Sequence, residues 1–319
     1  MRLAAGSAPR TEPPQVTVLM ATFNGRRWMD EQIDSILDQE DVRVTLVVSD
    51  DGSDDGTLQH LTERAGTDPR IRVLARREGP AGVAANFLHL FMGAAVPGQQ
   101  FVALSDQDDV WHSDKLKRQI ALLSGTGADA VSSNVTSFDG RGRRRLVVKS
   151  LPQRRWDYIF EAAGPGSTYV FTGDMHERLV RVLAGLDTSV FGVHDWLLYA
   201  LVRAVGGTWV IDDRPTVDYR QHGDNVQGEH AGFEAFRSRL SKLRSGFYRK
   251  QFLLIASAVR QVGAPVNGEG WTRDLDGLIG QLEDTGLRGR LSFWRRRGEI
   301  RRDRREGFEL ALAHLLWIW

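Results

Sequence analysis

Short apolar segments alternate with amphipathic segments through the first half of the chain. The apolar segments are rich in Val, Leu and Ile, as buried strands are, and span residues 16–21, 44–49, 71–74 and 101–104. The first is followed by apolar residues at helical spacing, namely Met29, Ile33, Ile36 and Leu37. This alternation predicts an α/β fold whose parallel sheet is covered by helices on both faces.

Further elements are expected up to the polar segment at residues 223–232. A helix is expected at 86–95, and another carries Leu116, Ile120 and Leu123 on one face, with Ser113 as a suitable N-cap. The remaining expected elements are strands at 130–138 and 146–149 around a basic turn at 140–145, a Gly/Pro loop at 164–167, a strand at 168–171, a helix at 194–205, and strands at 208–211 and 216–219.

The chain becomes helical beyond residues 223–232, where we place a domain boundary. Apolar residues follow helical spacing at Phe236, Leu240, Leu243 and Phe247, and again at Phe308, Leu312, Leu315 and Trp319. An arginine-rich segment, 295–305, precedes the second stripe. We therefore expect a disordered leader (1–14), an α/β domain (15–228) and a C-terminal helical region (229–319).

The composition removes several classes of function. The 319-residue chain contains no cysteine, which excludes disulfides, zinc sites made of thiolates and cysteine nucleophiles. Its formal net charge of +1 gives no sign of a nucleic-acid partner. No apolar run has the length of a membrane span, and residues 1–15 lack the apolar core of a signal peptide. We therefore expect a cytoplasmic protein.

Polar clusters follow the expected strands at their carboxyl ends. They are Thr22-Phe23-Asn24, Asp50-Asp51-Gly52-Ser53 and Asp106-Gln107-Asp108-Asp109. In open α/β sheets, ligands bind beyond the carboxyl ends of the strands, and right-handed crossovers would bring these ends to one rim. We therefore expect these clusters to line one site.

The cluster of Asp106, Asp108 and Asp109 carries the strongest chemical signal. Carboxylates this close together repel one another unless a cation neutralises them. Carboxylate oxygens are the ligands that Mg²⁺ and Mn²⁺ prefer, and Mg²⁺ commonly binds through one or two of them together with substrate phosphates. A solvated acidic turn, or an acidic start to the helix after Ser113, explains the same spacing equally well.

The acidic segment 50–56 also has more than one interpretation. Its Asp, Gly and Ser content is typical of a turn. A calcium-binding loop starting at Asp50 would end on a glutamate where this chain has Leu61. The remaining interpretation is a carboxylate that accepts hydrogen bonds from a nucleotide base or ribose.

The order of these motifs resembles a known family. The strings are VTVLMATFN at 16–24, VVSDDGSDDGT at 47–57, ALSDQDDVW at 103–111, VHDW at 193–196 and YRQHG at 219–223. Together they resemble the inverting glycosyltransferases of family 2, and SDQDDVW and YRQHG are most similar to its rhamnosyltransferase-like branch, which acts on cell-surface polysaccharides. The resemblance covers residues 16–228. It implies the GT-A fold, a Rossmann-like mixed sheet flanked by helices, with the C-terminal helical region as an extension.

The resemblance implies a nucleotide-diphosphate sugar as donor, with dTDP-L-rhamnose the first choice, and Mg²⁺ or Mn²⁺ as cofactor. Thr22, Asn24 and Asp51 would line the nucleotide-sugar pocket. Asp106 and Asp108 match a pair that binds ribose and metal.

Three further residues match the diphosphate side of the same site. Asp109 and His222 would join Asp108 at the metal, without deciding which aspartate binds it directly. Arg220 would contact the diphosphate, although pairing with a nearby acid explains it as well, and His222 could be an ordinary loop residue.

Asp195 matches the general base of the family. Its position at the start of a helix favours the anionic form through the helix dipole, although an acidic first turn alone is common. Gly166 and Ser167 resemble the acceptor-side loop, and Trp196 would either contact the acceptor or pack. His112 and His194 are expected to make structural or polar contacts.

The arginines of 295–305 have several interpretations. They form a solvated helix face, or attract anionic lipid headgroups while the stripe from Phe308 to Trp319 enters the interface, or belong to a dimerisation helix. Contact with the inner face of the plasma membrane is the one we favour, because many such enzymes use lipid-linked glycan acceptors.

Competing functions are a transferase that uses a UDP-hexose, a non-catalytic nucleotide-sugar-binding module, and a nucleotidyltransferase. The intact acidic cluster and Asp195 argue against the module. The last class usually has a glycine-rich phosphate loop after its first strand, where residues 21–27 contain only Gly25.

Overall fold

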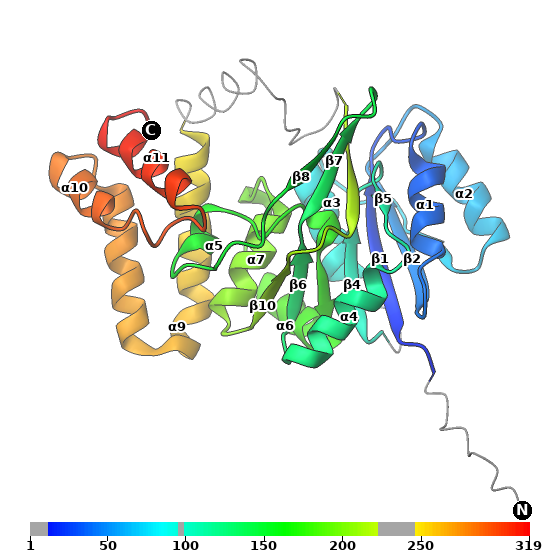
Figure 1. Cartoon of the computed structure of the whole chain (residues 1–319), viewed down its shortest axis with the longest axis horizontal. Helices are drawn as coiled ribbons and strands as arrows, with labels where there is room; N and C mark the ends of the chain where they lie inside the picture. The colour runs from blue at the N-terminus through cyan, green and yellow to red at the C-terminus, as the bar shows by residue number, and fades with distance from the viewer. Residues whose placement is uncertain (1–11, 95–98, 223–245) are drawn as a thin grey trace, which may run out of the picture.

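The computed structural model describes residues 12–94, 99–222 and 246–319 (Figure 1). A central sheet is flanked at one end by α1 (Met29–Leu37) and α2 (Thr57–Thr67), and at the other by a helical region. Within the described segments, the sheet has seven strands in the order β10-β6-β9-β4-β1-β2-β3. They are β1 (Gln15–Thr22), β2 (Arg43–Asp50), β3 (Ile71–Val73), β4 (Phe101–Ser105), β6 (Ala130–Ser133), β9 (Val170–Thr172) and β10 (Trp209–Asp212).

The sheet is mixed, so the expectation of a wholly parallel sheet from strand–helix alternation was wrong. Strand β9 lies between β4 and β6 and runs antiparallel to both. The segment before it already lies at the end of β4, since the Tyr169 carbonyl accepts a hydrogen bond from the Leu104 amide. The chain therefore enters β9 from the rim and runs back. The mixed sheet expected from the family resemblance is confirmed.

A second sheet joins two distant parts of the chain at the rim. It has the order β5-β11-β7-β8 and consists of β5 (Val110–Trp111), β11 (Val217–Gln221), β7 (Val135–Asp139) and β8 (Arg144–Val147). Val110 of β5 pairs with Asp218 of β11. The acidic cluster just before β5 is thereby brought to the residues that follow Asp218.

The expected strand at 130–138 is divided between the two sheets at Asn134. This buried side chain donates a hydrogen bond to the Asp213 carbonyl and accepts hydrogen bonds from the amides of Lys149 and Ser150. These bonds fix the bend between β6 and β7. The other expected strands are confirmed with ends shifted by a few residues.

Alternating residues of β1 separate the two faces of the main sheet. Val18 and Met20 pack with α1 and α4 (Lys115–Thr126), whereas Leu19 packs with α3 (Val83–Gly93) and α7 (His194–Ala204). Period-two alternation with apolar residues on both faces is the pattern of a buried strand. The remaining short elements are α5 (Asp157–Phe160), α6 (Gly173–Leu183), η1 (Gly166–Thr168) and η2 (Thr188–Val190).

The C-terminal helices share the core of the sheet. They are α9 (Phe247–Glu283), which is kinked at Gly268, α10 (Leu287–Arg295) and α11 (Arg304–Leu315). Phe252 of α9 packs edge-on against Trp196 of α7. The expected boundary at 223–232 and the residues Phe236, Leu240 and Leu243 lie outside the described residues. In the described ranges, no helix is both long and apolar enough to cross a membrane.

Two local expectations were wrong. Ser113 does not cap α4: its hydroxyl donates to Glu40 instead, and the helix begins after Asp114 without a side-chain cap. The segment 295–305 is not one helix face, because it spans the end of α10, a loop and the start of α11. Trp319 is buried, so it does not continue the exposed side of the stripe that begins at Phe308.

Candidate active site

The carboxyl ends of β1 and β2 are joined through Asp50. The Thr22 hydroxyl donates to Asp50 Oδ2 over 2.9 Å, and the amides of Gly52 and Ser53 donate to Asp50 Oδ1 over 3.0 and 2.9 Å. These contacts close the turn after β2. Thr22 therefore supports the turn that presents Asp51.

Asp51 is held by residues that the sequence did not suggest. Arg77 contacts both of its carboxylate oxygens, over 2.9 Å from Nε and 3.0 Å from Nη2, and the Gly82 amide donates to Oδ2 over 2.6 Å. Both side chains are nearly buried. Arg77 follows β3 in a segment without a motif, so only the fold identifies it as part of this pocket.

Gln107, the middle residue of the acidic cluster, fastens the loop after β1. Its side-chain amide accepts from the Phe23 amide and donates to the Phe23 carbonyl, each over 2.9 Å. A Cβ atom on Gly25 would lie 2.1 Å from Gln107 Oε1, so this contact requires glycine. Asn24 has a φ of 50° and accepts a hydrogen bond from the Asp54 amide. The ends of β1, β2 and β4 therefore meet as expected.

The acidic cluster contacts β11 at several points. The Arg220 amide donates to Asp109 Oδ1 over 3.0 Å, and Arg220 Nε donates to the Asp108 carbonyl over 2.8 Å. Asp108 Oδ2 lies 2.7 Å from His222 Nε2. The structure thus brings together the residues of the DQDD and YRQH strings, which are more than a hundred positions apart.

Arg220 is fixed between aromatic rings. Its guanidinium carbon lies 4.4 Å from the ring centre of Trp28 and 4.6 Å from that of Phe138, and it also pairs with Glu31. Trp28 also stacks on the His222 ring, with the two ring centres 5.7 Å apart. Trp28 lies just before α1, outside every motif, and sequence reasoning missed it.

Burial shapes the electrostatics of the cluster. Burial, with the charges of Asp108 and Asp195, raises the pKa of Asp106 to about 8. Burial, with the charges of Asp108 and Asp106, raises the pKa of Asp109 well above its usual range. Because the charge of Asp195 contributes to the raised pKa of Asp106, Asp195 lies near the acidic cluster.

The side chains of the acidic cluster and His222 offer part of a binding site for a divalent cation. Asp109 Oδ2 is buried without a hydrogen-bond partner, and the Ser167 hydroxyl close to Asp109 counteracts part of the rise in the pKa of this carboxyl group. Asp108 and His222 already touch. Across residues 12–94, 99–222 and 246–319, no three His, Asp or Glu side chains converge closely enough to hold a metal by themselves. Oxygens from a bound diphosphate would have to complete the coordination, as is usual for Mg²⁺.

Asp195 opens α7 and is 8% exposed. Burial raises its pKa to about 6, while hydrogen bonds from the amides of Trp196 and Gly166 and the charge of Lys149 act in the opposite direction. The amides at the start of the helix favour the anionic form, as expected, but burial outweighs them, so the net shift of the Asp195 pKa is upward. A base with this pKa is still deprotonated at neutral pH, and its proton affinity is better matched to catalysis there.

The acceptor-side loop lies directly against α7. A Cβ atom on Gly166 would come within 2.9 Å of His194 Nε2 and 3.4 Å of Asp195 Cβ. His194 stacks on Phe87 at 3.8 Å, and burial lowers its pKa to about 3, so it stays neutral. Its expected structural role is confirmed. Ser167 is fully buried in the same loop.

Trp196 packs in the core. It is 5% exposed, and its indole N–H donates to the Tyr158 carbonyl over 3.0 Å. Of the two roles expected for it, the structure places it in packing. His112 contacts Asp218 over 3.1 Å, as expected of a polar contact.

Lys149 is a basic residue near Asp195 that sequence reasoning missed. Burial and the charge of Arg301 lower the pKa of Lys149, and its own charge lowers that of Asp195. Within the described residues its ammonium group makes no ion pair. Lys149 lies four residues after the basic turn at 140–145, a run of six arginines and glycines, so nothing in the sequence set this one basic residue apart.

Comparisons with known proteins agree with this geometry. The family model described as Glycosyl transferase family 2 matches residues 17–182. The dTDP-rhamnosyl transferase RfbG of Shigella flexneri is 36% identical over 303 residues, which cover 94% of this chain and 100% of the relative. The succinoglycan biosynthesis protein ExoO of Rhizobium meliloti (strain 1021) is 36% identical over 221 residues, 66% of this chain and 61% of the relative.

Solved structures share the fold. The crystal structure of S. aureus TarS 1-349 in complex with UDP has a TM-score of 0.55 at 14% identity, covering 95% of this chain and 80% of that chain. At this level of identity the likeness concerns architecture alone. It agrees with the GT-A arrangement of a mixed sheet with a helical region after it.

Proposed function

The chain belongs to glycosyl transferase family 2, and on that basis we propose that it moves L-rhamnose from dTDP-rhamnose to a hydroxyl group of a growing cell-surface polysaccharide. The choice of donor rests on the Shigella flexneri relative, which is named a dTDP-rhamnosyl transferase and aligns over its whole length. The observation that supports the chemistry is the nearness of Asp195 to the acidic cluster: its charge raises the pKa of Asp106, and the loop of Gly166 and Ser167 lies beside both Asp195 and Asp109.

The proposed reaction is a single displacement with inversion. The acceptor hydroxyl oxygen bonds to the anomeric carbon as the bond from that carbon to the nucleoside diphosphate breaks. Asp195 takes the hydroxyl proton, and the diphosphate leaves with the bonding electrons. With a pKa of about 6, Asp195 is ionised at pH 7 and accepts this proton readily.

A divalent ion, Mg²⁺ or Mn²⁺, is part of the proposal. Asp108, Asp109 and His222 would hold it, because Asp109 Oδ2 is buried without a hydrogen bond and Asp108 already contacts His222. When bound, such an ion neutralises charge on a departing diphosphate. Arg220, held between Trp28 and Phe138, adds a fixed positive charge beside the same carboxylates.

Two parts of the candidate site suit the donor and the acceptor respectively. Asp51, orientated by Arg77 and Gly82, presents a carboxylate to the nucleotide, with Thr22 and Asn24 supporting the loops around it. Gly166 and Ser167 border Asp195, where a glycan or lipid-linked glycan would place its hydroxyl.

Donor binding and turnover test this proposal separately. We expect dTDP-rhamnose with Mn²⁺ to raise the melting temperature more than UDP-hexoses or GDP-mannose do, because a ligand that binds the folded state stabilises it by mass action. Asp109→Ala should weaken this metal-dependent shift. A panel in which no nucleotide sugar stabilises the protein would refute the function, and preference for a UDP-hexose would refute the donor.

Asp195→Asn should leave the donor-induced shift intact and lower turnover by about 10²–10⁴-fold, because only the proton acceptor is lost. Turnover is measured as release of the nucleoside diphosphate with acceptor, or with water as a slow acceptor. Asp187→Asn, an exposed carboxylate in the turn before α7, is the matched control and should be neutral. Normal turnover by Asp195→Asn would show that another group is the base.

A further inference from the structure

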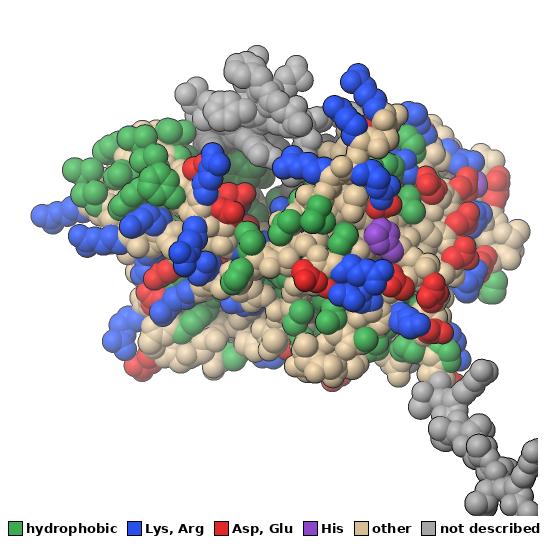
Figure 2. Space-filling model, viewed as in Figure 1, with side chains coloured by type: hydrophobic (Ala, Val, Ile, Leu, Met, Phe, Trp, Pro, Cys, Tyr) green, Lys and Arg blue, Asp and Glu red, His purple; other side chains and the backbone are tan. Residues whose placement is uncertain are grey.

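Large apolar side chains cover the outer side of the last two helices. Leu287 and Leu291, one turn apart on α10, are 55% and 44% exposed. Phe308 on α11 is 46% exposed, and Leu316 and Trp317, just after it, are each 58% exposed. Figure 2 shows hydrophobic side chains gathered at this end of the molecule. We call these five residues the apolar platform.

The apolar platform is held in place by contacts between the two helices. Trp294 meets Phe308 edge-on, with ring centres 5.0 Å apart. Arg290, which is 5% exposed, lies 4.7 Å from the Trp317 ring centre and donates hydrogen bonds to the carbonyls of His314 and Trp319. The helices that carry the exposed side chains are therefore held in a defined position relative to each other.

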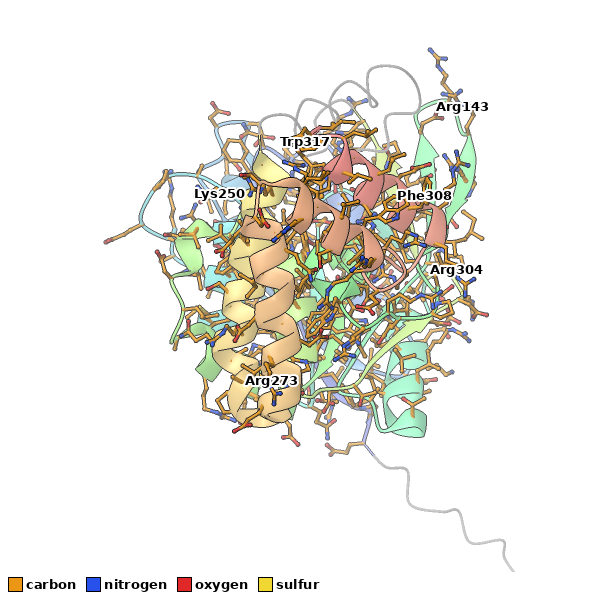
Figure 3. All side chains as sticks on the ribbon, turned by 90° about the vertical axis from the view of Figure 1, so that its left-hand side faces the viewer. Arg143, Lys250, Arg273, Arg304, Phe308 and Trp317 are labelled. Carbon is orange, nitrogen blue, oxygen red and sulfur yellow. The ribbon has the colours of Figure 1, made fainter. Side chains whose placement is uncertain are left out.

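Exposed arginines lie on the same two helices as the apolar platform and on the loop between them. Arg288, Arg295, Arg297 and Arg304 are exposed, and in the described part of the chain none of them makes an ion pair. Figure 3, which looks at this end of the molecule, shows Arg304 and Phe308 on α11 and Trp317 just beyond the end of this helix. Unpaired arginines beside exposed apolar residues combine the two attractions that hold a protein on an anionic bilayer.

The arginines of this segment divide into two sets. Arg302 turns inward, pairing with Asp157 and Glu161 over 3.3 and 3.1 Å, and its side chain is 2% exposed. Arg301 pairs with Glu306. Arg305 is exposed but also pairs with a carboxylate, that of Glu309 on the same helix. The exposed arginines that meet no carboxylate among the described residues are left to attract charge from outside the molecule.

We propose that the apolar platform docks on the surface of an anionic lipid bilayer, with its apolar side chains in the interface and the arginines over the lipid phosphates. Charge decides between this occupant and a second copy of the chain. Two copies that met through this surface would bring their unpaired arginines together, and like charges at an interface oppose association.

Docking would also orientate the proposed active site. Arg302 donates to the Ala162 carbonyl over 2.6 Å and binds Glu161, so the loop between α10 and α11 is tied to the segment that leads into Gly166, beside Asp195. The acceptor side thus lies on the same connected unit as the apolar platform. On the proposed function, this arrangement suits a lipid-linked acceptor, but binding to lipid does not depend on catalysis.

Co-sedimentation with vesicles tests the proposal on the full chain. We expect binding to vesicles of phosphatidylcholine mixed with phosphatidylglycerol, and much weaker binding to phosphatidylcholine alone or in high salt, which screens the arginines. The double variant Arg288→Gln/Arg304→Gln should lower the partition coefficient by about five-fold for each arginine. The double variant Leu287→Ser/Leu316→Ser should lower it on both vesicle types.

The matched controls lie elsewhere on the surface. Leu58→Ser on α2, 42% exposed, and Arg273→Gln on α9, whose side chain is 79% exposed, should bind vesicles as the wild type does. Unchanged melting temperatures would show that all variants fold, and unchanged nucleoside diphosphate release in solution would separate this result from the proposed function.

Several outcomes would overturn the proposal. One is wild-type protein that stays in the supernatant with anionic vesicles. Another is a loss of binding that is as large in the controls as in the platform variants. A third is wild-type protein that is dimeric without lipid while Leu287→Ser/Leu316→Ser is monomeric, which would assign the surface to a second copy of the chain.

Discussion

Replacing the proposed base should make the protein more stable at neutral pH. Asp195 is 8% exposed, and its pKa is raised to about 6 chiefly by burial, which penalises the charged form. The carboxylate must nevertheless be ionised to accept a proton. Asp195→Asn keeps the size of the side chain and removes the buried charge, so the cost of holding that charge should disappear.

The magnitude follows from the pKa. Between the usual value of 3.8 and about 6, the folded state of the wild type retains a proton that the unfolded state releases. Wild-type stability therefore falls as the pH rises through this window, by about 3 kcal/mol in full, since one pKa unit corresponds to about 1.4 kcal/mol. Asparagine can still accept a hydrogen bond from the Trp196 amide. Its NH₂ group, however, would face the Gly166 amide, so that one hydrogen bond is lost, at a cost of about 1 kcal/mol. We expect a net gain of about 2 kcal/mol at pH 7.

The same substitution at Asp157 should have the opposite sign. Asp157 is fully buried, but it pairs with Arg203 over 3.5 Å and Arg302 over 3.3 Å and accepts a hydrogen bond from Tyr199. Asp157→Asn removes the carboxylate that pairs with Arg203 and leaves Arg302 with Glu161 alone. Loss of one partner of a buried pair typically costs about 3–5 kcal/mol. Because the chemical change is the same in Asp195→Asn and Asp157→Asn, any difference in stability between the two variants reflects the surroundings of each carboxylate.

Urea denaturation of the wild type and both variants at pH 7, 5 and below 4 measures these differences. The advantage of Asp195→Asn should shrink steadily as the pH falls and should be absent below pH 4, where the wild-type carboxyl is protonated in both states. If Asp195→Asn were no more stable than the wild type at pH 7, or if its advantage did not depend on pH, the buried-charge argument would be refuted.

Other predictions concern pH dependence and the C-terminal region. The turnover number of the wild type should fall about ten-fold per pH unit below pH 6, as Asp195 becomes protonated, in a pH–rate profile. Lys149→Met should move this acid limb to higher pH, because the positive charge that lowers the pKa of Asp195 is lost, while Lys149→Arg should leave it in place. Arg302→Met should destabilise the protein by about 3–5 kcal/mol in the same denaturation assay, because Glu161 and Asp157 both lose a buried counter-charge and Asp157 keeps only that of Arg203. Arg304→Met should change stability by less than about 0.5 kcal/mol.

Much of the candidate site was visible in the sequence because its residues sit at the ends of recognisable strands. The apolar runs that became β1, β2 and β4 end at Thr22, Asp50 and Ser105, and the polar residues that follow them meet at one rim. Strand and helix periods are local properties, and so is the position of a polar residue after a strand. The rule that strand ends gather at one rim then supplied the site.

Residues that act through distant partners could not be found in this way. Arg77 binds Asp51 and Trp28 supports Arg220, yet both lie in segments without a motif. Arg77 contacts Asp51 only because the fold places the segment before α3 against the turn after β2. Trp28 contacts Arg220 only because β11 lies beside the start of α1. The antiparallel placement of β9 was hidden for the same reason, since a strand's direction depends on where the chain enters the sheet.

The sequence by itself determined which chemical groups the chain carries, their order, and the elements on which they lie. Tertiary structure decided their environment: that burial gives Asp195 a raised pKa, and that Arg302 turns inward to Asp157 while Arg304 faces outward. The physical reason is that burial and electrostatic interactions are sums over neighbours far apart in the chain, so adjacent residues of one type can face opposite surroundings.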